Sequence, residues 1–348
     1  MNFASDNTGP VHPAVMAALV EANDGYAMPY GADPLSLRVV EQVREAFEAP
    51  EAAVFLAATG TAANVLLLAT MAEPFETIFC ADCAHIHEDE CNAPELFTGG
   101  AKLTLVPHEA GRMAPEALRA AIEAEGTRGV HGPRRGPVSI TQATEKGAVY
   151  TLEELRALSG VARDHGLGVH MDGARFANAV AHLGCTPAEA SWKAGVDALS
   201  FGGTKNGLMG VEAMVLFDPA KAEELEYRRK RGAQLFSKHR YLAAQMGAYL
   251  TGGLWLESAR TANAAAAALA RGVEGAGGRL HAPQESNLLF ADLPRAAHQR
   301  LKAAGASYYL MAGTLEGDDP DEMLTARLVC DWSVTEAEIA RFCELAAG

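Results

Sequence analysis

The sequence lacks several features that mark particular classes of protein. It has no run of about 18 uncharged apolar residues, the length that a membrane-spanning helix needs. Its first residues, MNFASDNTGPVHP, contain neither a basic segment nor an apolar stretch, so we expect no secretion signal and a cytoplasmic location. Acidic residues outnumber basic ones, 44 to 29, and the formal net charge of −15 at pH 7 disfavours nucleic acid as a partner.

Cysteine is too sparse for a disulfide scaffold, with six residues in 348. One segment, CADCAHIHEDEC, places Cys80, Cys83, His85 and His87 at a spacing that zinc ligands can have. No second ligand pair with conventional spacing follows it. We therefore expect that Cys80 ends a buried strand, that the rest of the segment begins a helix, and that the protein binds no metal.

The sequence does contain a regular alternation of strand-like and helix-like segments. Apolar runs predict strands at residues 53–56, 77–80, 102–106, 138–142, 168–171, 198–201 and 211–217. Helices are expected between them at residues 62–71, 114–124 and 152–165. Strand and helix alternating at this spacing predict a mostly parallel sheet with helices on both faces. In such sheets, ligands bind beyond the carboxyl ends of the strands.

The pattern changes after about Pro219. A long helix is predicted over residues 223–253 and an alanine-rich helix over 259–270. The apolar segments SNLLFADL and TARLVCDW then predict two strands separated by a helix. This arrangement favours a smaller α+β domain at the C-terminal end, and a hydrophobic fraction of 49% is enough for two cores.

Two segments place ligand-binding groups where predicted strands end. In LAATGTAANV, Gly60 lets the backbone approach a ligand, Thr61 offers a hydroxyl, and the first amides of the following helix form an anion site suited to phosphate. In GVHMDGARFANAV, Asp172 can project into a cleft, although a helix N-cap would suit it equally well. Arg175 lies on the same side if that segment is helical, and is otherwise a surface arginine.

A third segment, SFGGTKNGLMG, places Lys205 among glycines after another predicted strand. A partly desolvated amine is nucleophilic, so this lysine is a Schiff-base candidate. A phosphate site, a carboxylate and a lysine at the ends of three strands match what pyridoxal 5′-phosphate needs. The helix end binds its phosphate, the acid keeps its pyridine nitrogen protonated, and the lysine forms the covalent link.

Over nearly its whole length, the chain resembles the threonine aldolases, which are pyridoxal phosphate enzymes with the aspartate-aminotransferase-like fold (fold type I). The segments that carry the resemblance are FASDNTGPVHPAV, YGADPLS, ATGTAANV, AHIHEDE, HMDGARFANA, LSFGGTKNGLMG and RLVCDW. GGTKNG differs from the SKGLG form of many members, so the chain resembles a divergent branch that includes phenylserine-type aldolases. The resemblance implies a large cofactor-binding domain over residues 16–250 and a small domain formed by 1–15 and 251–348.

The resemblance also assigns roles around the cofactor. Lys205 would be the Schiff-base lysine, Asp172 would face the pyridine nitrogen, and His85 would stack on the ring. Gly60 and Thr61 would hold the phosphate, with Asn64 near them.

Other roles concern the substrate and a neighbouring subunit. Ser5, Arg175 and Arg327 would hold the substrate carboxylate, for which an arginine fork is suited, and Arg175 would also lie near the cofactor. Arg231 and Lys238 match basic positions that approach the phosphate from a neighbouring subunit, and Tyr30 would lie near the substrate at the same shared edge. The resemblance therefore implies a homodimer or homotetramer with shared active sites.

One departure concerns the proton of the substrate hydroxyl. Family members often carry a second histidine in the loop that here reads ITQATEKGAVY, and the aligned residue is Thr144, which is no base at neutral pH. The proton would then pass to His85 or to water, while His87 would face solvent.

The activity that the resemblance implies is retro-aldol cleavage of a small β-hydroxy-α-amino acid, such as threonine, allo-threonine or phenylserine, to glycine and an aldehyde. A β-eliminating lyase or an aminotransferase on the same fold is an alternative, since a fold alone does not fix the reaction. A non-catalytic binding or regulatory module is disfavoured by the presence of both Lys205 and Asp172.

Overall fold

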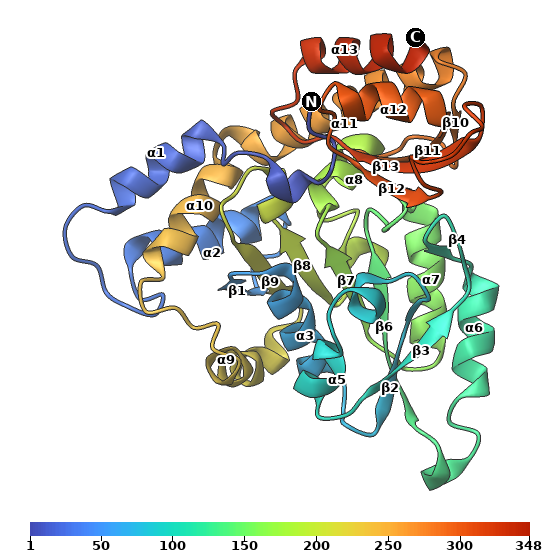
Figure 1. Ribbon diagram of the computed structural model, residues 1–348. Helices are drawn as coiled ribbons and strands as arrows, with labels where there is room; N and C mark the ends of the chain where they lie inside the picture. The colour runs from blue at the N-terminus through green and yellow to red at the C-terminus, as the bar shows by residue number, and fades with distance from the viewer.

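Two β-sheets of different size organise the chain, whose computed structural model describes all residues 1–348 (Figure 1). The large sheet has the strand order β1-β9-β8-β7-β6-β2-β3. Its strands are β1 (Ala53–Ala57), β2 (Glu76–Ala81), β3 (Lys102–Val106), β6 (Arg134–Thr141), β7 (Val169–Gly173), β8 (Ala198–Gly202) and β9 (Glu212–Leu216). Only β9 runs against the others, because it pairs antiparallel with both β1 and β8. The predicted mostly parallel sheet is therefore confirmed.

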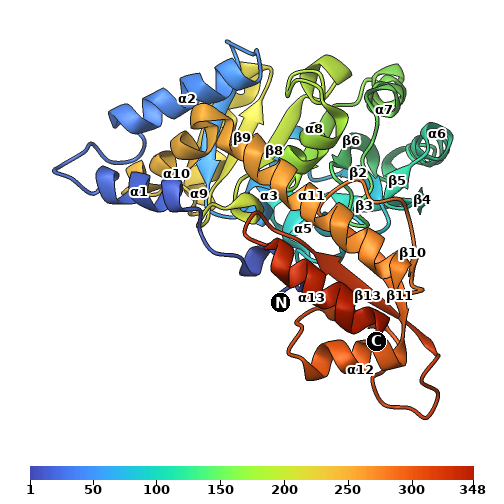
Figure 2. The ribbon, with the colours of Figure 1, turned by 90° about the horizontal axis from the view of Figure 1, so that it is seen from above.

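Helices cover both faces of this sheet (Figure 2). They are α1 (Pro13–Ala22), α2 (Pro34–Ala46), α3 (Gly60–Met71), α4 (His85–Glu88), α5 (Ala93–Thr98), α6 (Pro115–Ala124), α7 (Leu152–Asp164), α8 (Phe176–Leu183), α9 (Ala222–Arg231) and α10 (Arg240–Leu250). A short hairpin of β4 (His108–Glu109) and β5 (Arg112–Met113) follows β3. Every residue of β7, β8 and β9 is buried, as expected for strands covered on both faces.

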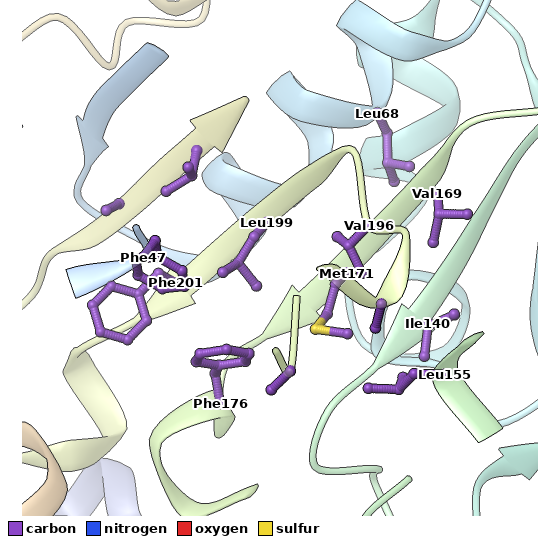
Figure 3. Packing of buried hydrophobic residues seen from close by; sticks show 14 of the residues in the cluster. Phe47, Leu68, Ile140, Leu155, Val169, Met171, Phe176, Val196, Leu199 and Phe201 are labelled. Atoms are coloured by element: carbon purple, nitrogen blue, oxygen red, sulfur yellow. The ribbon is translucent and has the colours of Figure 1, made fainter. Parts of the chain in front are cut away.

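The central strands divide their side chains between two apolar clusters. Leu199 and Phe201 of β8 belong to the larger cluster, in which Phe201 packs at ring-centroid distances of 5.3 Å from Phe47 and 6.0 Å from Phe176 (Figure 3). Ala198, next to Leu199 in the sequence, packs with residues of α3 in a separate cluster. This alternation follows from the two-residue period of a strand, and it fixes α3 on one face of the sheet.

The small sheet has the order β10-β11-β13-β12 and is antiparallel throughout. Its elements are β10 (Arg279–Leu280), β11 (Leu288–Pro294), β12 (Tyr309–Ala312) and β13 (Met323–Val329), covered by α12 (Arg295–Ala303) and α13 (Glu336–Ala347). Phe3 packs in the core beneath these helices, and Figure 1 shows the N-terminus beside this sheet. The long helix α11 (Leu254–Gly275) joins the two halves, since Trp255 lies in the large core and Val273 in the small one.

The structure corrects two expectations about the C-terminal third. The helix predicted over 223–253 is interrupted between α9 and α10, because Ala233 adopts a positive φ of 59° that an α-helix cannot contain. The small sheet also contains two strands that were not predicted, β10 and β12, which are short and partly exposed and therefore lack a clear apolar pattern. No helix combines the length and the hydrophobicity that crossing a membrane requires.

Candidate active site

A cavity of about 400 Å³ opens where β7 and β8 end and α3 begins. Six of the predicted site residues line it together: Gly60, Thr61, His85, Asp172, Arg175 and Lys205. They come from segments far apart in the sequence, which the parallel strands bring to one edge of the sheet.

One end of the cavity is the N-terminus of α3. Thr59 caps the helix by accepting a hydrogen bond from the amide of Ala62 at 3.1 Å, so the amides of Gly60 and Thr61 remain free. A Cβ at Gly60 would meet no atom within 4 Å, so the space before the helix end is open. Free amides and the helix dipole together favour an anion here.

Asp172 lies on the opposite wall and is held by the chain on both oxygens. Its Oδ1 accepts a hydrogen bond from the amide of Ala174 at 3.0 Å, and its Oδ2 accepts one from Asn64 Nδ2 at 2.8 Å. Burial alone would raise the pKa of Asp172, but the charges of His85 and Lys205 outweigh it and lower that pKa. Asp172 is therefore a fixed carboxylate, oriented by Asn64, which also lines the cavity.

His85 is the first residue of α4 and is oriented by a buried acid. Its Nδ1 lies 2.8 Å from Oε1 of Glu90, which also accepts a hydrogen bond from Asn64 at 2.9 Å. The hydrogen bond to Glu90 raises the pKa of His85, and the charge of Asp172 adds to this effect. His87, two residues on, is exposed, as expected.

Lys205 sits in a single 3-10 turn that its neighbours hold rigidly. Asn206 donates hydrogen bonds to the Tyr249 hydroxyl at 2.7 Å and to the Trp255 carbonyl at 2.8 Å. Burial lowers the pKa of Lys205, and no acidic group pairs with its amine within 4.0 Å. A lysine with a lowered pKa and no ion pair is more readily deprotonated than a surface lysine, which suits a nucleophile.

The glycines before Lys205 serve packing more than access. A Cβ at Gly202 would lie 2.6 Å from the carbonyl oxygen of Ala174, so the backbones of β8 and of the segment after β7 approach closely. Any side chain at Gly202 would therefore push these two segments apart.

Arg175 lines the cavity but is already paired within the chain. Its Nε and Nη2 donate to the two oxygens of Asp6 at 2.7 and 3.0 Å, and both side chains are buried. Burial opposes ionisation of Asp6, but the charges of Arg175 and Lys205 lower its pKa. The pair ties the N-terminal segment to the cavity, where Asn7 rather than the predicted Ser5 is a lining residue.

The other predicted residues lie outside the cavity of this chain. Arg327 on β13 is half-buried and donates a hydrogen bond to the carbonyl of Ala4 at 3.0 Å. Tyr30 is 51% exposed, and its ring lies 5.2 Å from Nζ of Lys230. Arg231 and Lys238 are exposed and form no ion pair within the chain.

Two carboxylates in the cavity were not predicted. Glu212, at the start of β9, accepts a hydrogen bond from the amide of Gly203 at 2.7 Å, and burial raises its pKa to about 7. Glu145 follows β6 and lines the cavity from the other side. The sequence does contain a sign of Glu212: this acid lies within the apolar run VEAMVLF, where a solvent-exposed charge is not expected.

Thr144 does not line the cavity. Its hydroxyl donates to the Ala110 carbonyl at 2.8 Å and accepts from the amide of Ala148 at 3.1 Å, within a buried turn away from the cavity. The neighbouring Glu145 does line the cavity, together with Thr141 and Ala143 of the same segment.

The cavity residues fit pyridoxal phosphate. The free helix end suits a phosphate, Asp172 suits a protonated ring nitrogen, and Lys205 offers an unpaired amine.

Comparison with known proteins agrees with this geometry. The family model described as β-eliminating lyase matches residues 2–296. The chain is 43% identical to the low specificity L-threonine aldolase of Pseudomonas aeruginosa, covering 99% of this chain and 95% of the relative. It is 41% identical to that of a Pseudomonas species, covering 99% and 96%.

A solved structure extends the agreement to the fold. The threonine aldolase of Leishmania major superposes with a TM-score of 0.92 at 26% identity, covering 99% of this chain and 98% of that one. A match over this share of both chains includes both sheets. The chain therefore belongs to the β-eliminating lyase family of pyridoxal phosphate enzymes and, within that family, to the threonine aldolases.

Proposed function

We propose that this enzyme cleaves β-hydroxy-α-amino acids, such as threonine, allo-threonine and phenylserine, to glycine and an aldehyde. The observation that carries the proposal is the placement of Lys205, whose unpaired amine shares one cavity with the carboxylate of Asp172 and the free end of α3. The similarity to low specificity L-threonine aldolases supports this choice over other reactions of the fold.

The chain would hold the cofactor at three points. The amides of Gly60 and Thr61 would bind the phosphate, Asp172 would hold a proton on the ring nitrogen, and Lys205 would be the amine that joins it. His85 would lie against the ring, oriented by Glu90 through the 2.8 Å contact. When bound, pyridoxal phosphate supplies an aldehyde for the amine and a protonated ring that takes up an electron pair.

Arginines would orient the substrate. Arg175 uses Nε and Nη2 on Asp6, which leaves Nη1 for a carboxylate, and Arg327 uses only Nη1 on Ala4. Two fixed guanidinium groups would hold the substrate carboxylate in one position, and this would fix the orientation of the Cα–Cβ bond for cleavage. Ser5 and Tyr30 would complete the substrate site at its edges.

We further propose a homodimer or homotetramer in which Arg231 and Lys238 of one subunit approach the phosphate of another. Both cations are exposed and unpaired in their own chain. Large apolar side chains are also exposed nearby, on α1, α2 and the segment between them: Met16, Val20, Tyr26, Met28 and Leu37. Such side chains favour a protein interface.

The division into a large domain (16–250) and a small domain (1–15 and 251–348) is part of the same proposal. Phe3 supports it from the N-terminal side because it packs in the core of the small sheet. The boundary near residue 250 is supported by the kink at Gly252, which has a φ of 64° and separates α10 from α11.

A panel of amino acids tests the function. Purified enzyme with pyridoxal phosphate should release equal amounts of glycine and aldehyde from threonine, allo-threonine or phenylserine. Release of ammonia and a keto acid would indicate β-elimination, and a requirement for a keto acid acceptor would indicate an aminotransferase. No turnover of any amino acid would contradict the proposal.

A further inference from the structure

Glu145 carries an unsatisfied carboxylate oxygen and lines the cavity that contains the reactive lysine. Its Oε2 is closed off from solvent and has no hydrogen-bond partner, while the residue lines the same cavity as Lys205 and Asp172. Buried polar atoms are nearly always paired, so an unpaired one in a binding cavity marks a contact with a ligand.

The other oxygen of Glu145 is firmly anchored. Oε1 accepts hydrogen bonds from the amide of His85 at 2.9 Å and from the hydroxyl of Thr141, at the end of β6, at 2.8 Å. The backbone around Glu145 is fixed as well, because the adjacent residue Thr144 forms hydrogen bonds with Ala148 that close a tight turn. One oxygen is therefore held by the chain while the other is left free.

Cleavage of a β-hydroxy-α-amino acid needs a proton acceptor at the hydroxyl. The other acidic groups that line the cavity accept hydrogen bonds from the chain: Asp172 accepts two, and Glu212 accepts one from the amide of Gly203 on Oε2. His85 is held by Glu90, and the hydrogen bond to that acid raises the pKa of the imidazole, so it keeps its proton to higher pH. Among the acids that line the cavity, Glu145 is the one with a buried carboxylate oxygen, Oε2, that has no hydrogen-bond partner.

We propose that Glu145 Oε2 accepts the β-hydroxyl proton of the substrate. This inference rests on the proposed retro-aldol function. The O–H bond breaks and its proton moves to Oε2, while its electron pair becomes the second C–O bond of the aldehyde. When bound, the cofactor would take up the electron pair of the broken Cα–Cβ bond, and a proton would then form the Cα–H bond of glycine. Glu145 returns the first proton to water.

The surroundings of Glu145 suit this role. Burial raises its pKa, and the charge of Asp172 raises it further. A carboxylate with a raised pKa is a stronger base than a solvated one. Only the ionised form can act, so the cleavage rate should fall as the pH falls through this raised pKa and should level off above it.

The variant that tests the proposal is Glu145→Gln. Glutamine keeps an oxygen that can accept from His85 and Thr141, so the anchoring survives while the base is lost. We expect kcat for phenylserine cleavage to fall about 10²- to 10⁴-fold, the usual contribution of a positioned base. The acidic limb of the pH profile should also disappear. Glu88→Gln, which alters an exposed acid on α4, is the matched control and should behave as wild type.

Two further measurements separate a base from a structural residue. Exchange of the α-hydrogen of glycine with deuterated water uses the same site but no hydroxyl proton, so Glu145→Gln should keep it within about threefold of wild type. Infrared titration of the whole protein, with and without cofactor, should show a carboxyl band of raised pKa that Glu145→Gln removes. Thermal unfolding should match wild type.

The outcomes are distinct. Normal phenylserine cleavage by Glu145→Gln, or equal losses of cleavage and glycine exchange, would overturn the assignment of Glu145. Failure of the wild-type enzyme to release benzaldehyde and glycine would instead overturn the proposed function, and the infrared titration would still report whether Glu145 has the raised pKa.

Discussion

The cavity and the segment from Arg228 to Arg240 handle charge in opposite ways. Around the cavity, Asp172, Glu90 and Glu145 are held by hydrogen bonds from their own chain. In the basic segment, Arg231 and Lys238 point into solvent without a partner. Burying a charge is costly unless it is paired, whereas an exposed cation costs little to leave alone. The cavity is thus preorganised for a ligand, while the basic segment is available to another molecule.

The largest effect should come from Lys205→Ala. It removes the only lysine of the cavity, and we expect glycine release from threonine to fall by at least about 10³-fold, since a covalent step is lost rather than weakened. The unfolding temperature should stay close to that of wild type. Lys102→Ala, at an exposed position on β3, is the matched control. Near-normal turnover by Lys205→Ala would remove the lysine from the chemistry.

Asp172→Asn tests the carboxylate that the cavity holds most tightly. Asparagine is neutral, so it would no longer favour a proton on the ring nitrogen, and kcat should fall about 10²- to 10³-fold, as when one preorganised electrostatic group is removed. Affinity for the cofactor, followed by its absorbance, should weaken as well. Equal rates for Asp172→Asn and wild type would contradict the proposed role.

The basic segment can be tested by mixing two defective variants. Lys238→Glu should lower activity by placing a negative charge near a neighbour's phosphate, while Lys238→Arg should retain most of it. After dissociation and reassembly with Lys205→Ala, statistical mixing of a dimer should restore up to about a quarter of wild-type activity, because one site of each hybrid is intact. If hybrids form and activity stays absent, or if a fully active monomer sediments alone, the shared site is wrong.

The smallest effect is expected at Arg327. Loss of one charge-assisted contact is worth about 1.5–3 kcal/mol, so Arg327→Ala should raise KM for amino acids roughly tenfold to a hundredfold with a smaller change in kcat. Arg327→Lys should recover part of this loss, because the charge returns without the fork. An unchanged KM in both variants would place Arg327 outside the substrate site.

The sequence predicted the large sheet well because its strands are short apolar runs with clear ends. The strand at Lys102–Val106 was predicted to the residue, and the other strand ends agree within a few residues. Lys205 and Asp172 were found because each lies at or close to the carboxyl end of such a strand. The break between α9 and α10 was missed, since a single left-handed residue, Ala233, leaves no mark in composition.

The acids of the cavity were harder to foresee. Glu145 and Glu90 lie in irregular segments, and their importance comes from hydrogen bonds to residues distant in the sequence. The pairing of Arg175 with Asp6 joins residues 169 positions apart in the sequence, which no local pattern encodes. Tertiary contacts, rather than residue type, decide which of several acids is free to react.

The direct test of the site is to identify the lysine that binds the cofactor. Wild-type protein loaded with pyridoxal phosphate is reduced with borohydride and digested, and the labelled peptide is sequenced by mass spectrometry. We expect one stable label, on Lys205 within SFGGTKNGLMG, and no label at this peptide in Lys205→Ala. A label on another lysine, or loading without any reducible link, would contradict the assignment on which the proposed chemistry depends.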